Sequence, residues 1–178
     1  MAWNARSNQP LTGIVVPLVT PLAGRDALDS SGLVRLIDHV LAGGVHGIFL
    51  LGTTGEGPAH SYALRETLIR ESCRHIAGRL PVLVGITDTS IEQAIGVARR
   101  SADAGADVVV LAPPYYYTPS QPQLIDYVRQ VARESPIPVF IYNIPSMTKT
   151  VFEVDTVIAC LELPNVIGFK DSSGNMIY

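Results

Sequence analysis

The segment from Gly47 to Gly85 reads GIFLLGTTGEGPAHSYALRETLIRESCRHIAGRLPVLVG and contains one full repeat of the pattern that decides the fold. An apolar run at Gly47–Leu51 leads into a glycine-rich turn, and Ser61–Ala77 then places apolar residues at helical spacing. A second apolar run, Val82–Gly85, closes the repeat. Short runs of valine, isoleucine and leucine are typical of strands buried on both faces. The segment therefore predicts a strand, a helix and a second, parallel strand.

The same alternation continues on both sides of this segment. Further strands are expected at Ile14–Val19, Asp107–Leu111, Val139–Tyr142 and Val166–Lys170, and further helices at Ser30–Ala42, Ile91–Ala104, Gln121–Glu134 and Val154–Leu161. Repeated strand–helix units predict an α/β protein with a parallel sheet. An open doubly wound sheet and a (β/α)8 barrel both fit, because both bury continuous apolar strands. No GxGxxG motif follows the first strand, which counts against dinucleotide binding.

Composition and charge exclude several classes of protein. The 178 residues are 47% hydrophobic and 16% charged with a net charge of −3, which is typical of a globular protein without a basic surface for nucleic acid. Met1–Pro10 lacks the apolar stretch of a signal peptide, so neither secretion nor membrane insertion is expected. Cys73 and Cys160 are far apart, which indicates no disulfide framework and a reducing, cytoplasmic setting. The four histidines form no metal-ligand pattern, and we expect no metal.

A glycine-rich turn follows the strand at Gly47–Leu51. It consists of Gly52, Thr53, Thr54, Gly55, Glu56 and Gly57. Glycines let the backbone approach a ligand, and neighbouring hydroxyl and N–H groups can hold a carboxylate. An anion site is one interpretation. The other is a strand-to-helix turn whose polar residues cap the next helix.

Two further strands end in residues that can take part in catalysis. Tyr142 ends one strand, where its phenol can act as a general acid and base, although a core tyrosine with a satisfied hydroxyl is the alternative. Lys170 ends another in an apolar setting. Burial disfavours the charged form of a lysine and so supplies the neutral amine that attacks a carbonyl. The alternative for Lys170 is an ion pair with Asp171, or a side chain that extends from the strand end into solvent.

An aromatic loop, Pro113–Pro119, follows the strand at Asp107–Leu111 and contains Tyr115, Tyr116 and Tyr117. Such a cluster can cap an active site or pack in an oligomer interface.

Taken together, these motifs resemble the signature segments of the dihydrodipicolinate synthase and N-acetylneuraminate lyase superfamily in order and spacing. The matching segments are Gly13–Pro21, Gly52–Glu56, Pro114–Tyr116, Tyr142–Pro145 and Gly168–Asp171. The resemblance covers nearly the whole chain and implies a (β/α)8 barrel, of which this chain supplies about six strands.

The resemblance also implies roles for individual residues. Lys170 matches the lysine that forms a Schiff base with pyruvate or a similar 2-oxo acid, and Tyr142 matches the proton-transfer tyrosine beside it. Gly52, Thr53 and Thr54 match the carboxylate-binding segment, in which the threonines also relay protons. Tyr116 matches the tyrosine that, in many members, reaches across a tight dimer, so a homodimer or homotetramer is expected. The implied reaction is aldol-type addition of pyruvate to an aldehyde or the reverse cleavage, without a metal or organic cofactor.

The chain departs from the family pattern in its acceptor residues. Synthases usually have an arginine two residues after the Tyr-Asn-x-Pro segment, where it binds the carboxylate of aspartate semialdehyde, but here Ser146 is followed by Met147. A methionine cannot pair with a carboxylate, which predicts weak synthase activity on that aldehyde. Lyases usually have serine at the position of Thr53, so the match to them is incomplete as well.

The length is the second departure. Barrels typically need about 250 residues, and Tyr178 stands eight residues beyond Lys170. We therefore expect residues 1–178 to form a single barrel domain without its last two strands or any C-terminal helical extension. Two other functions compete with the Schiff-base enzyme. One is a non-catalytic binding or interaction protein that keeps a truncated barrel, and the other is a phosphate-binding enzyme that uses Gly52–Gly57, although this turn lacks the lysine of a P-loop.

Overall fold

The computed structural model describes residues 10–178, which form two compact units. The first unit contains the described residues up to Gly85 together with Arg100–Val108. The second contains Ile86–Arg99 and Val109–Tyr178. Most of the segment on which we based the expectation of no signal peptide, Met1–Pro10, lies outside the described residues.

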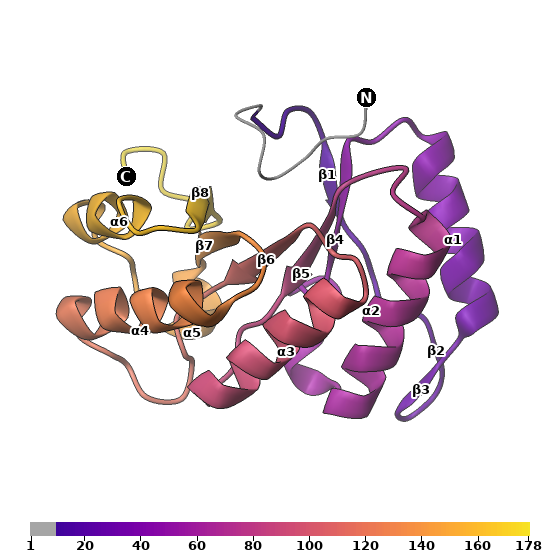
Figure 1. The fold of residues 1–178 in the computed structure, drawn as a ribbon, viewed down its shortest axis with the longest axis horizontal. Helices are drawn as coiled ribbons and strands as arrows, with labels where there is room; N and C mark the ends of the chain where they lie inside the picture. The colour runs from indigo at the N-terminus through magenta and orange to yellow at the C-terminus, as the bar shows by residue number, and fades with distance from the viewer. Residues whose placement is uncertain (1–9) are drawn as a thin grey trace. The chain divides into compact units, whose positions relative to one another are not determined.

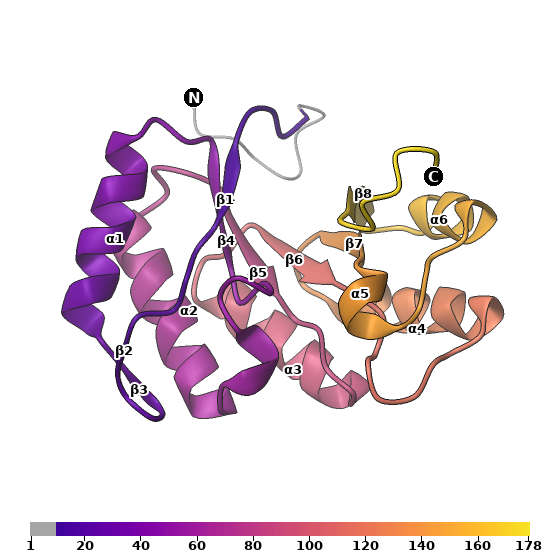
Figure 2. The same cartoon turned by 180° about the vertical axis from the view of Figure 1, so that it is seen from behind.

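The first unit is built on three parallel strands, β1 (Val15–Pro17), β4 (Gly47–Leu50) and β5 (Val82–Gly85). Strand β4 lies between the other two, and all four of its residues are buried, as a continuous apolar run predicts. Helices α1 (Ser30–Ala42) and α2 (Tyr62–Ile76) lie side by side in Figures 1 and 2. The structure adds a 3₁₀ turn, η1 (Gly57–Ala59), and a short hairpin of β2 (Leu22–Gly24) and β3 (Ala27–Leu28).

Capping residues fix where these helices begin and end. The carboxylate of Asp29 accepts a hydrogen bond from the backbone N–H of Gly32 at 2.8 Å, which starts α1. The hydroxyl of Ser61 accepts from the N–H of Leu64 at 3.2 Å and starts α2. Ala77 ends α2 in the left-handed conformation, with φ of 50°. The expected helix at Ser61–Ala77 is confirmed, with both of its end residues serving as caps.

The second unit also has three parallel strands, β6 (Val108–Leu111), β7 (Val139–Asn143) and β8 (Val166–Asp171), although β6 and helix α3 have residues in both units. Its helices are α3 (Ile91–Asp103), α4 (Gln121–Glu134), α5 (Pro145–Thr148) and α6 (Val154–Leu161). Helices α4 and α6 lie side by side. The bounds of α4 and α6 are those that the sequence predicts, while the four-residue helix α5 was not expected. Among the described residues, no helix combines the length and apolar character needed to cross a bilayer.

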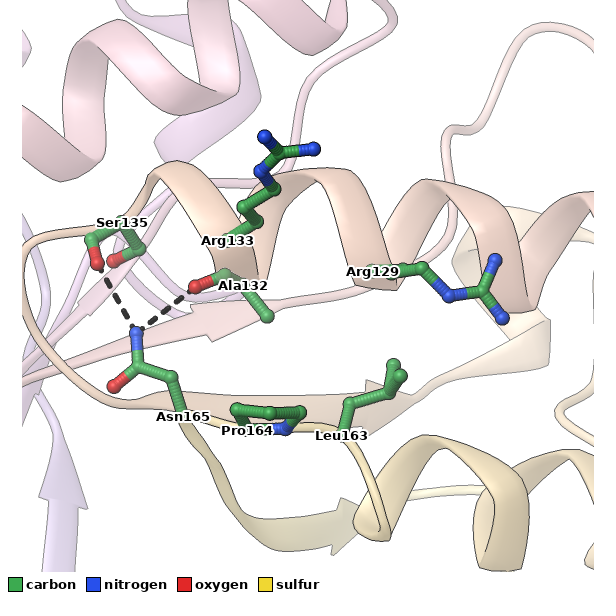
Figure 3. A pocket seen from close by; sticks show the side chains of 7 residues that line it. All are labelled: Arg129, Ala132, Arg133, Ser135, Leu163, Pro164 and Asn165. Atoms are coloured by element: carbon green, nitrogen blue, oxygen red, sulfur yellow. Dashed lines mark hydrogen bonds between the residues drawn. The ribbon is translucent and has the colours of Figure 1, made fainter.

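Asn165 organises the turn between α6 and β8. Its side-chain amide lies 3.1 Å from the carbonyl oxygen of Ala132, 3.1 Å from that of Ser135 and 3.2 Å from that of Ile137. Figure 3 shows this amide at the wall of a cavity of about 660 Å³, beside the C-terminal end of α4. Because the amide carries two hydrogens, at most two of these three carbonyls receive a full hydrogen bond at once. Asn165 also adopts the left-handed conformation, with φ of 71°.

Replacing Asn165 separates these two contributions. Asn165→Gly keeps the left-handed turn but loses the amide, and we expect it to reduce the free energy of unfolding by about 2 kcal/mol. Asn165→Ala loses the amide and also strains the backbone, so it should cost about 1 kcal/mol more. Chemical denaturation of both variants measures the difference. Equal stability of the two variants would show that the backbone conformation carries no cost at this turn.

Candidate functional site

Lys170 and Tyr142 are neighbours across strands β8 and β7. The two residues are register partners in the parallel pair, so their side chains lie on the same face of the sheet. The Lys170 Nζ lies 3.5 Å from the centroid of the Tyr142 ring, a cation–π distance. The structure thus brings together the two residues to which the sequence assigns amine and proton-transfer chemistry.

Their exposure differs. Tyr142 is 7% exposed, whereas Lys170 is only half-buried and therefore less buried than its apolar sequence setting predicts. The physical reason lies in the strand: among the described strands β8 pairs only with β7, and Val166 is its one buried residue. The amine of Lys170 accordingly remains in contact with solvent in this structure.

Ser172 joins the two side chains. Its Oγ accepts a hydrogen bond from Lys170 Nζ at 2.8 Å and one from the Tyr142 hydroxyl at 3.2 Å. The sequence reasoning did not single out Ser172. A signal was present, because residues two apart in an extended chain project to the same face and Ser172 stands two residues after Lys170.

The opposite face of the strand pair holds a supporting pair, Asn143 and Asp171. The buried Asn143 donates from Nδ2 to the Asp171 Oδ1 at 2.8 Å, and its Oδ1 accepts from the backbone N–H of Phe152 at 3.1 Å. Burial acts to raise the pKa of Asp171, but hydrogen bonds from Asn143 and Ser173 outweigh it and lower the pKa. Asp171 bonds to Asn143 and Ser173, and Lys170 bonds to Ser172, so the ion pair with Asp171 that the sequence left open is not the main contact of either residue.

Gly168 is needed for the packing of β7 against β8. A Cβ at this position would lie 2.7 Å from the ring of Phe140, its register partner, where no atom fits without displacing the ring. A glycine two residues before Lys170 therefore lets an aromatic side chain cover the strand backbone.

The glycine-rich turn belongs to the first unit. The backbone N–H groups of Gly55 and Gly57 donate to the carbonyl of Gly52 at 3.1 Å and 3.3 Å, so the turn is closed by its own hydrogen bonds. A Cβ on Gly57 would lie 2.2 Å from the carbonyl oxygen of Leu51, which explains the glycine there. Gly52 is buried, while Thr53 and Thr54 are exposed. The carboxylate-binding and proton-relay roles of these three residues stay predictions.

The carbonyl of Gly55 receives further polar contacts. The Thr20 hydroxyl donates to it at 2.7 Å, and the Nε2 of the buried His60 lies 3.0 Å away. The contact gives the buried His60 a structural partner within the turn. Within residues 10–178, no group of three or more histidine, cysteine, aspartate or glutamate side chains is arranged to hold a metal ion.

In the aromatic loop, Tyr116 and Tyr117 are exposed at 74% and 81%. Their rings meet edge to face with centroids 4.9 Å apart. Two aromatic side chains held at the surface in this way suit either of the expected uses, a cap over a site or an oligomer contact. The role of Tyr116 in a dimer stays a prediction.

The model of the Dihydrodipicolinate synthetase family matches residues 10–178, which is nearly the whole chain. The chain belongs to this family. Among curated relatives, it is 40% identical over 166 residues to the 4-hydroxy-tetrahydrodipicolinate synthase of Azoarcus sp. strain BH72, and the match covers 93% of this chain and 57% of the relative. The chain thus spans little more than half the length of the curated relatives it matches.

Solved structures agree with this assignment. The dihydrodipicolinate synthase from Bacteroides thetaiotaomicron superposes with a TM-score of 0.92 at 52% identity, covering 97% of this chain and 58% of that one. The chloride-inhibited dihydrodipicolinate synthase from Acinetobacter baumannii, complexed with pyruvate, superposes with a TM-score of 0.90 at 30% identity, covering 94% and 58%. The fold is that of a (β/α)8 barrel, of which this chain supplies six strands, and the open doubly wound alternative is excluded.

Proposed function

We propose that this chain carries the Schiff-base centre of a lyase or aldolase of the dihydrodipicolinate synthase type, which condenses pyruvate with an aldehyde or cleaves the product. The observation that carries the proposal is the placement of the Lys170 amine and the Tyr142 phenol on one hydroxyl, that of Ser172. Family membership supports it, as does a related synthase solved in complex with pyruvate.

The proposed chemistry begins with the neutral Lys170 amine. It attacks the keto carbon of pyruvate, a carbon–nitrogen bond forms, and the carbonyl π electrons move to oxygen. A proton passes from nitrogen to that oxygen, a second proton reaches it, and water leaves to give the imine. The protonated imine withdraws electrons from the pyruvate methyl carbon, which then loses a proton and adds to the aldehyde. Tyr142 is the proposed proton carrier for these steps.

The remaining roles rest on the family resemblance. We assign Gly52 and Thr53 to the carboxylate of the 2-oxo acid, Thr54 to proton relay and Tyr116 to a contact across a homodimer, with a homotetramer as the larger assembly. The described residues are taken as part of a single barrel domain. A cytoplasmic location is proposed as well, supported by the free, buried cysteines Cys73 and Cys160.

Reductive trapping tests the proposed function without knowledge of the aldehyde. Borohydride reduces an imine to a stable amine, so treatment with pyruvate should add the mass of one reduced pyruvate adduct to the intact protein. Lactate, which has no keto group, is the matched control and should add nothing. A protein that gains no adduct with pyruvate is not a Schiff-base enzyme for this substrate, and the non-catalytic binding protein becomes the better interpretation.

The acceptor aldehyde depends on the position of Met147. Its side chain is 57% exposed on α5, and the nearby ammonium of Lys149 donates to the carbonyl of Ser146 at 2.9 Å. Lys149 could in principle replace the missing arginine, but its ammonium is already bound to the backbone. An aldehyde without a carboxylate at this point suits the site better than aspartate semialdehyde.

We expect weak turnover of pyruvate with aspartate semialdehyde and better turnover with uncharged aldehydes. Hydrogen bonds to charged groups contribute about 1.5–3 kcal/mol, so Met147→Arg should raise the specificity constant for aspartate semialdehyde about 10- to 100-fold. Met147→Leu, which keeps the size and adds no charge, is the control and should leave it unchanged. Steady-state assays over a panel of aldehydes measure this. Efficient synthase turnover by the unmodified protein, with no gain from the arginine, would contradict the assignment.

A further inference from the structure

We infer that Ser172 is a positioning residue of the Schiff-base reaction, which holds the Lys170 amine beside the Tyr142 phenol and passes a proton between them. This inference rests on the proposed function, because it assigns a role within the same reaction. It comes from the two hydrogen bonds on Ser172 Oγ, one from each of the reacting side chains.

Two contacts restrict the position of the Lys170 amine more than the packing around its strand does. A lysine side chain has many rotamers, and Lys170 is only half-buried, so packing alone leaves its amine mobile. Two contacts oppose this freedom: the 2.8 Å hydrogen bond to Ser172 and the position of Nζ over the Tyr142 ring. Both direct the nitrogen toward the phenol. Holding a nucleophile near its proton-transfer partner lowers the entropic part of the activation barrier of the chemical step.

Ser172 is itself held in register. Its backbone N–H donates to the carbonyl of Asn143 at 2.9 Å, which extends the pairing of β7 with the chain just beyond the end of β8. Asn143 is fully buried and bound to Asp171 and to Phe152, so this anchor is rigid. The backbone of Ser172 therefore has a fixed position along the strand, which places its hydroxyl beside Tyr142.

The chemistry of a hydroxyl fits a relay. A serine hydroxyl donates one hydrogen and accepts two, and its hydrogen can rotate between partners. The relay requires both hydroxyls to turn, so that Ser172 donates to the Tyr142 oxygen and the phenol donates to the substrate. After the amine has attacked the keto carbon, a proton on nitrogen then moves to Ser172 Oγ as the serine hydrogen moves to the Tyr142 oxygen. The phenol hydrogen moves at the same time to the oxygen of the former carbonyl. The serine and the phenol each end with the number of protons with which they began, and the net result is one proton carried from nitrogen to oxygen.

Three variants test this role, with the rate of imine formation as the readout. Ser172 is exposed, so Ser172→Ala removes the hydroxyl without opening a cavity, and Ser172→Thr restores it. The matched control is Ser173→Ala, which removes a hydroxyl from the next residue in the chain. This hydroxyl binds the carboxylate of Asp171 at 2.8 Å and has no part in the proposed relay. The protein is mixed with pyruvate, quenched with borohydride at successive times, and the adduct is measured by intact mass.

We expect Ser172→Ala to slow imine formation on the order of tenfold or more, since proton transfer by positioned groups typically contributes ~10²–10⁴-fold. The final extent of trapping and the pyruvate concentration that half-saturates it should stay near those of the unmodified protein, which a general loss of structure would not allow. Ser172→Thr should recover most of the rate, and Ser173→Ala should retain it.

The outcomes distinguish this inference from the proposed function. If the unmodified protein forms no adduct, the proposed function fails, and the role of Ser172 fails with it. If the unmodified protein forms the adduct and Ser172→Ala forms it at the same rate, only the inference about Ser172 is overturned. Equal slowing of the alanine and threonine variants also overturns it, because the hydroxyl would then have no part in the effect.

Discussion

Replacing Lys170 by alanine is expected to abolish the pyruvate-dependent mass increase after borohydride treatment. The substitution removes the only atom of this residue that can form the imine, and the side chain is half-buried, so the loss should not unfold the protein. Lys149 is the other lysine among these 178 residues and provides the control. Lys149→Ala should trap pyruvate like the unmodified protein.

An adduct on another amine has to be excluded as well, because the N-terminal α-amino group of a protein is also a primary amine. Peptide mapping after borohydride treatment therefore has to place the adduct on the fragment that contains Lys170. An adduct that persists at full level in Lys170→Ala, or that maps to Lys149, would remove Lys170 from the mechanism and with it the proposed site.

Much of the fold follows from local sequence signals. Helix α4 was predicted from its helical spacing of apolar residues, and its bounds are confirmed because Ser120 and Gln123 form a capping box at its start. The hairpin β2–β3 was missed because its five residues show no alternation of apolar and polar side chains and are mostly exposed. Helix α5 was missed because four residues are too few to show a helical period, although Pro145 stands at its first position.

The two reactive residues of the candidate site could be predicted from the sequence, but their exposure and hydrogen-bond partners could not. Tyr142 and Lys170 each stand near a strand end, and parallel pairing alone makes them neighbours. The exposure of Lys170 was not predictable, because it depends on which strands flank β8 rather than on the apolar residues beside the lysine in sequence. Ser172 was not predicted as a site residue because serine is common after strands. Only its hydrogen bonds to Lys170 and Tyr142 distinguish it.

The second large effect is expected at Tyr142. Tyr142→Phe should slow turnover by ~10²–10⁴-fold, the usual contribution of general acid–base catalysis, while the half-saturating concentration of pyruvate changes little. The reason is that phenylalanine keeps the ring under the Lys170 amine and removes only the hydroxyl that moves protons. Exchange of the pyruvate methyl hydrogens for deuterium in heavy water reports the proton-transfer step without requiring the aldehyde.

The control for Tyr142→Phe is a tyrosine that loses its hydroxyl without chemical consequence. Tyr127 on α4 is buried, and its hydroxyl has no hydrogen-bond partner among the described residues. Burial raises the pKa of the Tyr127 phenol well above its ordinary value, so this hydroxyl stays protonated. Tyr127→Phe should therefore exchange deuterium into pyruvate at the unmodified rate. If Tyr142→Phe did the same, the phenol beside Lys170 would be a packing group, and proton transfer would have to be assigned to another residue.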